Sequence, residues 1–489
     1  MSAAPQLRSS QSRPGLDAAI VALLIVCSLR LSAPTLGSFF SFDDLHNLHF
    51  YLSHPREAVL ANLTVITSFR RPLGALLYLP LYDLFGMDPF PYYLTLLLLY
   101  CLNIALAWSL AARVTGSRWA GAIAAAIAAY HPVVHNVVFN FGAIYELLSF
   151  TFIASAIHAY MNCIRSAPHR RIWYWLTIAL FALGLDAKET VVVLPAVLLL
   201  HELGTALAGG VIRGGLRGLA LRLGPLFAIA VAYTLAKTMG EGAMWRTSPA
   251  YQYRLDFGFY SNLAYYLSSL TTGMLPASQG VLSAVLALGA GLAIVLRSYP
   301  MLFGGGFALL TLLPILPMPR VWDLYLYLPL FGVGVYLAAL ASALREIAGR
   351  HLRILRPGLG GLGDAWRFAV LALLLGGIVQ WSHPRFEAGG DYYLRWSAPW
   401  KEFALQLWRR YPAMPRNAVL GFESPPFDPD TWERYGLHLL VWLRYDNLGL
   451  GVFRLPEQRD EFLEAADRAS VVHLFRYEDG VLVEGSIDD

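Results

Sequence analysis

The chain has 489 residues, of which 57% are hydrophobic and only 14% are charged, whereas charged residues make up about a quarter of an ordinary soluble protein. This composition excludes an ordinary soluble protein and indicates one that crosses a membrane. The net charge of +4 comes from arginines in short clusters between apolar runs, so they report topology and we expect no nucleic-acid partner. The three cysteines lie in or beside apolar stretches and support neither a disulfide framework nor a thiolate metal site.

The N-terminal part of the chain predicts two membrane helices separated by a long outer loop. A cytoplasmic tail, residues 1–14, precedes an apolar run from about Asp17 to Gly37, which ends without a cleavage site and is long enough to span. The next charge-free run of sufficient length covers Pro91 to Ala112. Within the loop, residues 38–90, the apolar piece 72–86 is too short to cross about 30 Å. We expect that piece to be a juxtamembrane or re-entrant helix.

The number of spans follows from the arginine clusters, which should fall on alternate, cytoplasmic turns. They do so with about eleven spans, and most acidic residues then lie on the outer side. The charge-free stretch 257–296 is open to one or two spans. Two would place the most basic loop, residues 345–367, outside, so we favour one span at 281–296 after an interfacial or re-entrant helix. The expected fold is an all-α polytopic membrane domain over residues 15–383, with its chemistry on the outer face.

From about Pro384 the composition becomes that of a soluble domain, with dispersed charges, prolines and short strand-like strings. These strings are NAVLGF, GLHLLVWLRY and VVHLFRYEDGVLVE. The last predicts two strands joined at the turn Glu478–Asp479–Gly480. We expect residues 384–489 to form a small α+β cap outside the cytoplasm.

The strongest candidate for chemistry is the acidic pair Asp43 and Asp44, which follows the first helix among aromatic residues. A structural interpretation is that the pair caps the next helix, whose first amides favour carboxylates. A functional interpretation is a general base that deprotonates an acceptor hydroxyl, with the second carboxylate tuning the first or binding the acceptor. We expect no cofactor, and the alternative is a divalent metal held by the acidic pair with His46, His49 or His54.

Several outer residues are candidates for binding an anionic substrate. Arg71 can hold a lipid phosphate by paired hydrogen bonds, or simply contact lipid headgroups. Lys188 can neutralise a phosphate, or pair with the adjacent Glu189. Glu146 lies near the start of a membrane helix, where an unpaired carboxylate is strongly disfavoured.

Two further outer segments carry polar residues at helix ends. His131 and His135 are more simply structural, with substrate contact as the alternative. Arg320 and Asp323 bring a charge pair, and Tyr325 an aromatic ring, to another outer helix end. Aromatic residues at an interface are common, so Tyr325 alone indicates little.

Taken in chain order, these segments resemble the GT-C superfamily of polyprenyl-phosphate-dependent glycosyltransferases, especially the protein O-mannosyltransferase and TMTC-like branch. FDD after the first helix is similar to the acidic first-loop motif, and FRRPLGALLYLPLYDLFG to the Arg-Pro-Leu passage. YHPVVHNVVFNFGAIYELLSF is similar to the His-Pro segment with its acidic helix start. LGLDAKETVVVLPAVLLLHE resembles the Lys-Glu signature with its acidic end, and DLYLYLPLFGVGVYL the Tyr-Leu-Tyr-Leu-Pro segment. The resemblance covers roughly residues 15–345.

The resemblance implies an inverting transferase that moves a single sugar, with mannose as one candidate, from a polyprenyl phosphate to an acceptor hydroxyl. Asp43 would be the catalytic base, supported by Asp44. The candidates for binding the donor phosphate are Arg71, Lys188, Arg320 and Arg254. The candidates for other substrate contacts are His46, His131, Glu146, Glu189, Asp323 and Tyr325. Tyr145 and Leu324 depart from the family, because relatives often carry arginine at these two positions.

The expected location is the bacterial inner (plasma) membrane, with the site on the extracytoplasmic side. The expected partners are the lipid-linked sugar donor, membrane lipids, and an acceptor protein or glycan. A lipid-linked-substrate transporter or flippase is one alternative, but it should show inverted repeats and charges at the midplane, and neither pattern is visible in the sequence. A non-catalytic membrane scaffold is the other alternative, and it predicts no binding of lipid phosphate.

Overall fold

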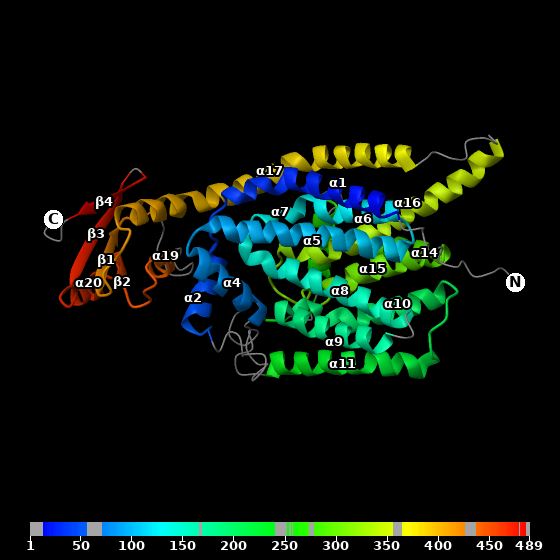
Figure 1. Ribbon diagram of the computed structural model, residues 1–489, viewed down its shortest axis with the longest axis horizontal. Helices are drawn as coiled ribbons and strands as arrows, with labels where there is room; N and C mark the ends of the chain where they lie inside the picture. The colour runs from blue at the N-terminus through cyan, green and yellow to red at the C-terminus, as the bar shows by residue number, and fades with distance from the viewer. Residues whose placement is uncertain are drawn as a thin grey trace.

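The computed structural model describes residues 13–55, 71–165, 169–239, 252–253, 256, 258–272, 278–355, 364–425, 437–478 and 480–485. Within these ranges the protein is mostly helical and carries one four-stranded sheet near its C-terminus. Figure 1 shows the long helices side by side in a bundle, with the sheet beyond one end of it. The protein is therefore a helical membrane protein with a small C-terminal α+β unit.

The first part of the bundle agrees with the sequence prediction. Helix α1 (Pro14–Ser32) and the short helix η1 (Ala33–Gly37) together form an apolar segment long enough to span. Helix α2 (Phe42–Ser53) follows and carries the acidic pair. The short apolar piece is helix α4 (Pro72–Phe85), and the next span is α5 (Pro89–Thr115).

The rest of the bundle consists of long helices joined by short helical turns. In chain order these are α6 (Arg118–Tyr130), η2 (Pro132–Val134), α7 (His135–Val138), η3 (Phe141–Ala143), α8 (Ile144–Arg165), α9 (Arg170–Ala187), η4 (Glu189–Val193), α10 (Leu194–Leu207), α11 (Gly215–Met239), α13 (Gly258–Leu270), α14 (Gln279–Val295), α15 (Tyr299–Leu312), η6 (Asp323–Leu326) and α16 (Tyr327–Leu355). The stretch 257–296 contains two separate helices, α13 and α14, and of these two α14 has the apolar composition of a membrane helix.

The helix lengths show a multi-pass membrane protein. Among the described residues six segments are long and apolar enough to cross a membrane, or seven if the bent pair from α6 to α7 is one span. The eleven spans expected from the arginine pattern stay a prediction, since several apolar helices of the bundle, such as α14 and α15, are shorter than a full membrane span.

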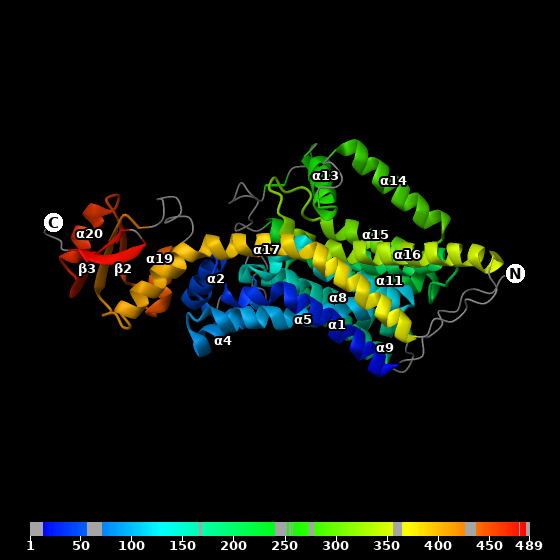
Figure 2. The same ribbon diagram turned by 90° about the horizontal axis from the view of Figure 1, so that it is seen from above.

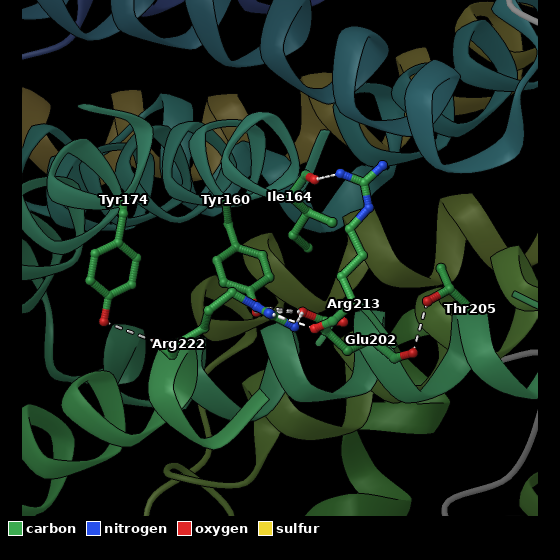
Figure 3. A network of polar contacts seen from close by, with 7 residues as sticks. All are labelled: Tyr160, Ile164, Tyr174, Glu202, Thr205, Arg213 and Arg222. Carbon is green, nitrogen blue, oxygen red and sulfur yellow. Dashed lines mark hydrogen bonds and ion pairs between the residues drawn. The ribbon is translucent and has the colours of Figure 1, made fainter. Parts of the chain in front are cut away.

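The arginines of the connecting turns gather at the bundle end away from α2. There a buried network joins three helices: Glu202 of α10 accepts hydrogen bonds from Tyr160 of α8 (2.8 Å) and from Arg222 of α11 (2.6 Å), as Figure 3 shows. Arg213 donates to the backbone carbonyl of Ile164 beside it. Tyr160 lies fourteen residues after Glu146 on the same helix, about 20 Å along its axis. Glu202, which bonds Tyr160, thus lies about 20 Å along α8 from Glu146.

A single helix, α17 (Asp364–Arg410), connects the bundle to the sheet. Figures 1 and 2 show it running along the bundle past α1 and on to the C-terminal unit. The helix is continuous across residues 383 and 384, where the sequence predicts the domain boundary. Bundle and C-terminal unit thus share one helix.

The C-terminal sheet contains β1 (Ala418–Glu423), β2 (Gly451–Leu455), β3 (Val471–Glu478) and β4 (Val481–Gly485). The strand order is β2-β1-β3-β4, with β1 parallel to β2 and β3, and β3 antiparallel to β4. The strand predicted for NAVLGF and the strand pair at the C-terminus are confirmed. Helix α20 (Arg459–Ala466) packs against β1 and β2.

The prediction of a strand for GLHLLVWLRY is wrong, because this segment forms helix α19 (Leu437–Arg444). Its apolar run buries Leu439, Leu440, Val441 and Leu443. A short run that is apolar on every side fits a buried strand or a buried helix equally well. The contacts of α19 with α2 and α17 decide between the two.

Candidate active site

The start of α2 meets several segments that are distant in the sequence, all at the bundle end that faces the sheet. Helix α2 packs against α4 and η3, η3 packs against the start of α8, and η4 packs against α8. In Figure 1, α2 and α4 lie between the long helices and the C-terminal unit. Most of the polar residues predicted for the site come together here.

Asp44 is fully buried, and both of its carboxylate oxygens are used. Oδ2 accepts hydrogen bonds from the backbone N–H (2.7 Å) and the hydroxyl (2.8 Å) of Ser41, and Oδ1 accepts one from the Tyr78 hydroxyl (2.9 Å). Ser41 in turn caps the amide of Asp44, which completes a reciprocal capping box. Asp44 thus fixes the start of α2 and joins it to α4.

Asp43 is exposed, although it is the direct neighbour of Asp44. It lies in the first turn of α2, where the helix amides favour a negative charge. Its Cβ lies so close to Gly142 that a Cβ added to that glycine would be 2.8 Å away. Gly142 therefore lets η3 approach α2, and the Asp43 carboxylate stays accessible at this junction.

The burial of Asp44 makes the stability of the protein depend on pH. Burial raises the pKa of the Asp44 carboxyl to about 7, and the hydrogen bonds from Ser41 and Tyr78 only partly oppose this. The folded state therefore binds a proton more tightly than the unfolded state, so this group's contribution to the free energy of unfolding falls as pH rises from about 4 to about 7.

We expect the Asp44→Asn variant to lose this dependence, because an amide does not titrate. The measurement is the Tm of both proteins in detergent at a series of pH values. The Tm of the wild type should fall relative to that of the variant as pH rises through this range. Parallel curves would contradict the assignment of the effect to Asp44.

Arg71 and Glu189 form an accessible ion pair beside the acidic pair. Arg71 precedes α4 and donates from Nη2 to Oε2 of Glu189 (3.1 Å), and both side chains are about 30% exposed. The guanidinium lies 4.6 Å from the ring centroid of Tyr145, whose hydroxyl is 2.7 Å from that of Tyr51. The ring of Tyr145 on α8 thus packs against the guanidinium of Arg71, which comes from the segment before α4.

Lys188 and Glu146 form a second ion pair, which is buried. The Nζ of Lys188 donates to Oε1 of Glu146 and lies 4.6 Å from the ring centroid of Tyr325. The side chains are 6% and 2% exposed. Of the two alternatives for Lys188, the pairing with the adjacent Glu189 is not formed, because Glu189 pairs with Arg71. Because the backbone of Lys188 is extended, two consecutive side chains point apart and find separate partners.

Three candidate histidines, His46, His131 and His135, form hydrogen bonds with backbone groups. His131 Nδ1 accepts from the Val133 amide (3.3 Å), so Nε2 carries the proton and donates to the carbonyl of Leu270 (3.0 Å). The Nδ1 of His135 bonds the Pro132 carbonyl (2.7 Å), and that of exposed His46 bonds the Phe42 carbonyl (3.0 Å). These contacts fit the structural interpretation of His131 and His135.

The remaining candidates are Tyr325, Asp323, Arg320 and Arg254. Tyr325 of η6 reaches Lys188, and Asp323 begins the same short helix. Arg320 is exposed, and its guanidinium lies 4.4 Å from the ring centroid of Trp322. Arg254 lies outside the described residues.

The described residues contain no group of three or more His, Cys, Asp or Glu side chains that could hold a metal ion. The alternative set of Asp43, Asp44, His46 and His49 is not assembled. Asp44 is turned inward to Ser41 and Tyr78, whereas His49 lies beside Trp442 of α19, with 5.8 Å between ring centroids.

Two tryptophans of α17 complete the surroundings of the acidic pair and were missed by the sequence analysis. The rings of Trp396 and Trp400 lie 4.5 and 4.8 Å from that of Phe42, and Trp400 Nε1 donates to the carbonyl of Phe40 (3.1 Å). Their spacing of four places both on one helix face. That spacing was the available signal, but we assigned this segment to the cap.

Comparisons with known proteins give one family match and several similar folds. Residues 70–236 match the family described as Dolichyl-phosphate-mannose-protein mannosyltransferase. The structure is similar to ArnT from Cupriavidus metallidurans bound to undecaprenyl phosphate, with a TM-score of 0.50 and 16% identity over 96% of this chain and 94% of that chain. No curated protein matches the sequence.

Two structures from Archaeoglobus fulgidus also match with a TM-score of 0.50. One is the oligosaccharyltransferase in the apo form, with 13% identity over 95% of this chain and 70% of that chain. The other is the oligosaccharyltransferase AglB in complex with an inhibitory peptide and a dolichol-phosphate, with 12% identity over 96% of this chain and 70% of that chain. At such identities the likeness concerns the fold.

Proposed function

We propose the reaction of this chain from its resemblance to the GT-C superfamily of polyprenyl-phosphate-dependent glycosyltransferases, which the family match over residues 70–236 and the similar fold support. The chain moves a single sugar, with mannose as the first candidate, from a polyprenyl phosphate to an acceptor hydroxyl, with inversion at the anomeric carbon. The observation that carries this proposal is the contrast between two adjacent carboxylates: Asp44 is buried and fully hydrogen-bonded, whereas Asp43 is exposed.

Asp43 acts as the general base. Its carboxylate takes the proton of the acceptor hydroxyl while the hydroxyl oxygen forms a bond to the anomeric carbon. The bond from that carbon to the phosphate oxygen breaks, and the polyprenyl phosphate leaves with the electron pair. Direct displacement requires one base and inverts the anomeric configuration, so Asp44 is free to serve as the cap of α2.

Arg71 is the best placed cation for the donor phosphate, because its side chain is accessible and planar. Glu189 and the Tyr145 ring hold the guanidinium in position, and a phosphate can share its five N–H donors with Glu189. Undecaprenyl phosphate in ArnT and dolichol-phosphate in AglB support a lipid phosphate as the leaving group. Lys188 is buried against Glu146, so it makes no direct contact with the phosphate, and its positive charge stabilises the phosphate from a distance.

The arginine-bearing turns support an orientation with the site outside the cytoplasm. These turns lie at the far end of the bundle from α2, and arginine-rich turns are typically cytoplasmic. The acceptor, a protein or a glycan, then reaches Asp43 from the side of the C-terminal sheet.

The Arg71→Gln variant should bind the donor less tightly. Loss of a charge-assisted pair of hydrogen bonds is expected to raise the donor KM by about tenfold. Arg320→Gln is the matched control, because it removes another outer arginine that stacks on a single aromatic ring. A tenfold increase of the donor KM in Arg320→Gln, with no increase in Arg71→Gln, would assign the phosphate site to Arg320.

The proposed function is tested by supplying purified protein with radiolabelled polyprenyl-phosphate sugars, mannose first, and a membrane extract as the source of acceptor. Label should move from the lipid to an acceptor with the wild type and not with Asp43→Asn. The labelled product then identifies the acceptor class. Absence of transfer from every donor, together with no binding of lipid phosphate, would overturn the proposal.

A further inference from the structure

A recess lies apart from the acidic pair, between the last turns of α17, the end of α19 and the turn from α4 to α5. Its volume is about 430 Å³, which lies in the range of small-molecule sites. Its walls combine apolar side chains, among them Phe85, Leu405 and Trp408, with the cations Lys401, Arg409 and Arg444. The recess is therefore amphipathic.

The charges of the recess favour an anion. Three cations face one carboxylate, Asp88, which already accepts a hydrogen bond from the first turn of α5. Arg409 and Arg444 are exposed, and the Arg444 guanidinium lies 5.6 Å from the ring centroid of Trp408. Lys401 donates to the carbonyl of Gly37 (3.0 Å). Two guanidinium groups thus remain accessible on an aromatic wall, an arrangement suited to a phosphate.

An apolar track leads away from the recess along α5. This helix begins at Pro89 in the wall of the recess and is one of the membrane-spanning candidates. Every fourth residue of its outer face is an exposed large apolar side chain: Phe90 (47%), Leu94 (38%), Leu98 (63%) and Leu102 (48%). Residues four apart lie on one helix face, so these side chains form a continuous stripe.

We propose that the recess binds the headgroup of an anionic phospholipid, with the phosphate between Arg409 and Arg444 and the acyl chains along the α5 stripe. A phospholipid matches both features, because its phosphate and its chains are joined, whereas a free phosphate would use the cations alone. The site is separate from the donor phosphate site. Arg71 precedes α4 and the recess adjoins its other end, about 20 Å along the helix.

The test measures binding of defined lipids to the full-length protein in detergent. Phosphatidylglycerol should bind in native mass spectrometry and raise the Tm, whereas phosphatidylcholine and inorganic phosphate should do neither. Each arginine is expected to contribute about fivefold in affinity. The Arg409→Gln and Arg444→Gln variants should each bind phosphatidylglycerol about fivefold more weakly, and the double variant about 25-fold.

Arg468→Gln is the matched control, since it removes an exposed arginine of the C-terminal unit that pairs with Glu464 outside the recess. Equal binding of the two phospholipids by the wild type would overturn the proposal, as would full binding by the double variant. Protection by inorganic phosphate alone would show an anion site and overturn the lipid assignment. If the double variant fails to fold, the Arg409→Gln single variant is compared with Arg468→Gln instead. Unchanged binding of phosphatidylglycerol by Arg409→Gln would then overturn the proposal.

Discussion

The Asp43→Asn variant is expected to transfer sugar about a hundredfold to ten-thousandfold more slowly than the wild type, because the amide cannot take the acceptor proton. Donor binding should be unchanged, since Asp43 lies on α2 and the donor phosphate is assigned to Arg71. The measurement is the single-turnover rate of label transfer from the lipid, with donor affinity determined separately. Asparagine has nearly the same size as aspartate, so the junction between α2 and Gly142 is preserved.

The matched control for Asp43→Asn is the same substitution at its neighbour. In Asp44→Asn the amide oxygen can still accept from Ser41, and the amide nitrogen can donate to the Tyr78 hydroxyl. We expect this variant to fold and to keep most of the transfer rate. An active Asp43→Asn with an inactive Asp44→Asn would reverse the roles of the two carboxylates. Full activity of both variants would show that neither Asp43 nor Asp44 is the general base.

The Lys188→Ala variant is expected to lower the free energy of unfolding by about 3–5 kcal/mol, because it leaves the buried Glu146 carboxylate without its partner. Replacing both residues, as in Lys188→Met with Glu146→Leu, should recover most of this loss, since similar apolar side chains fill the same space. The measurement is the denaturation of each variant in the same detergent. A stable single variant would contradict the buried ion pair.

The double variant also separates the stability of the fold from its chemistry. A folded double variant that transfers sugar more slowly, with donor KM unchanged, would show that the Lys188 charge assists the departure of the phosphate. A folded double variant with the wild-type rate would give Lys188 and Glu146 a structural role alone.

The position of the acidic pair was predictable from the sequence, but which of the two carboxylates is buried and which is exposed was not. Ser41 and Asp44 at a spacing of three are a sequence signature of a capping box. Which carboxylate remains accessible depends on Tyr78 and Gly142, which approach α2 from two other segments. Consecutive helix residues point about 100° apart, so one tertiary contact separates a structural carboxylate from an accessible one.

The partners of Lys188 and Arg71 could not be predicted from the sequence for a similar reason. Lys188 and Glu146 are 42 residues apart, and Arg71 and Glu189 are 118 apart. The adjacent Lys188 and Glu189 were the simplest pair by proximity along the chain, yet the extended backbone between them directs the two side chains to different segments. The lengths of the apolar runs did predict α1, α4 and α5, because those helices depend mainly on local composition.

The contact between Phe40 and Trp400 spans 360 residues of the chain. During synthesis from the N-terminus, α2 is made long before α17. Phe42 therefore lacks its contacts with Trp396 and Trp400 through most of synthesis. Closing such a distant contact belongs to the last steps of folding. Chains that stop before α17 carry both carboxylates but leave Phe42 without its two tryptophans. We therefore expect the acidic segment to acquire its complete surroundings only when the whole chain is present.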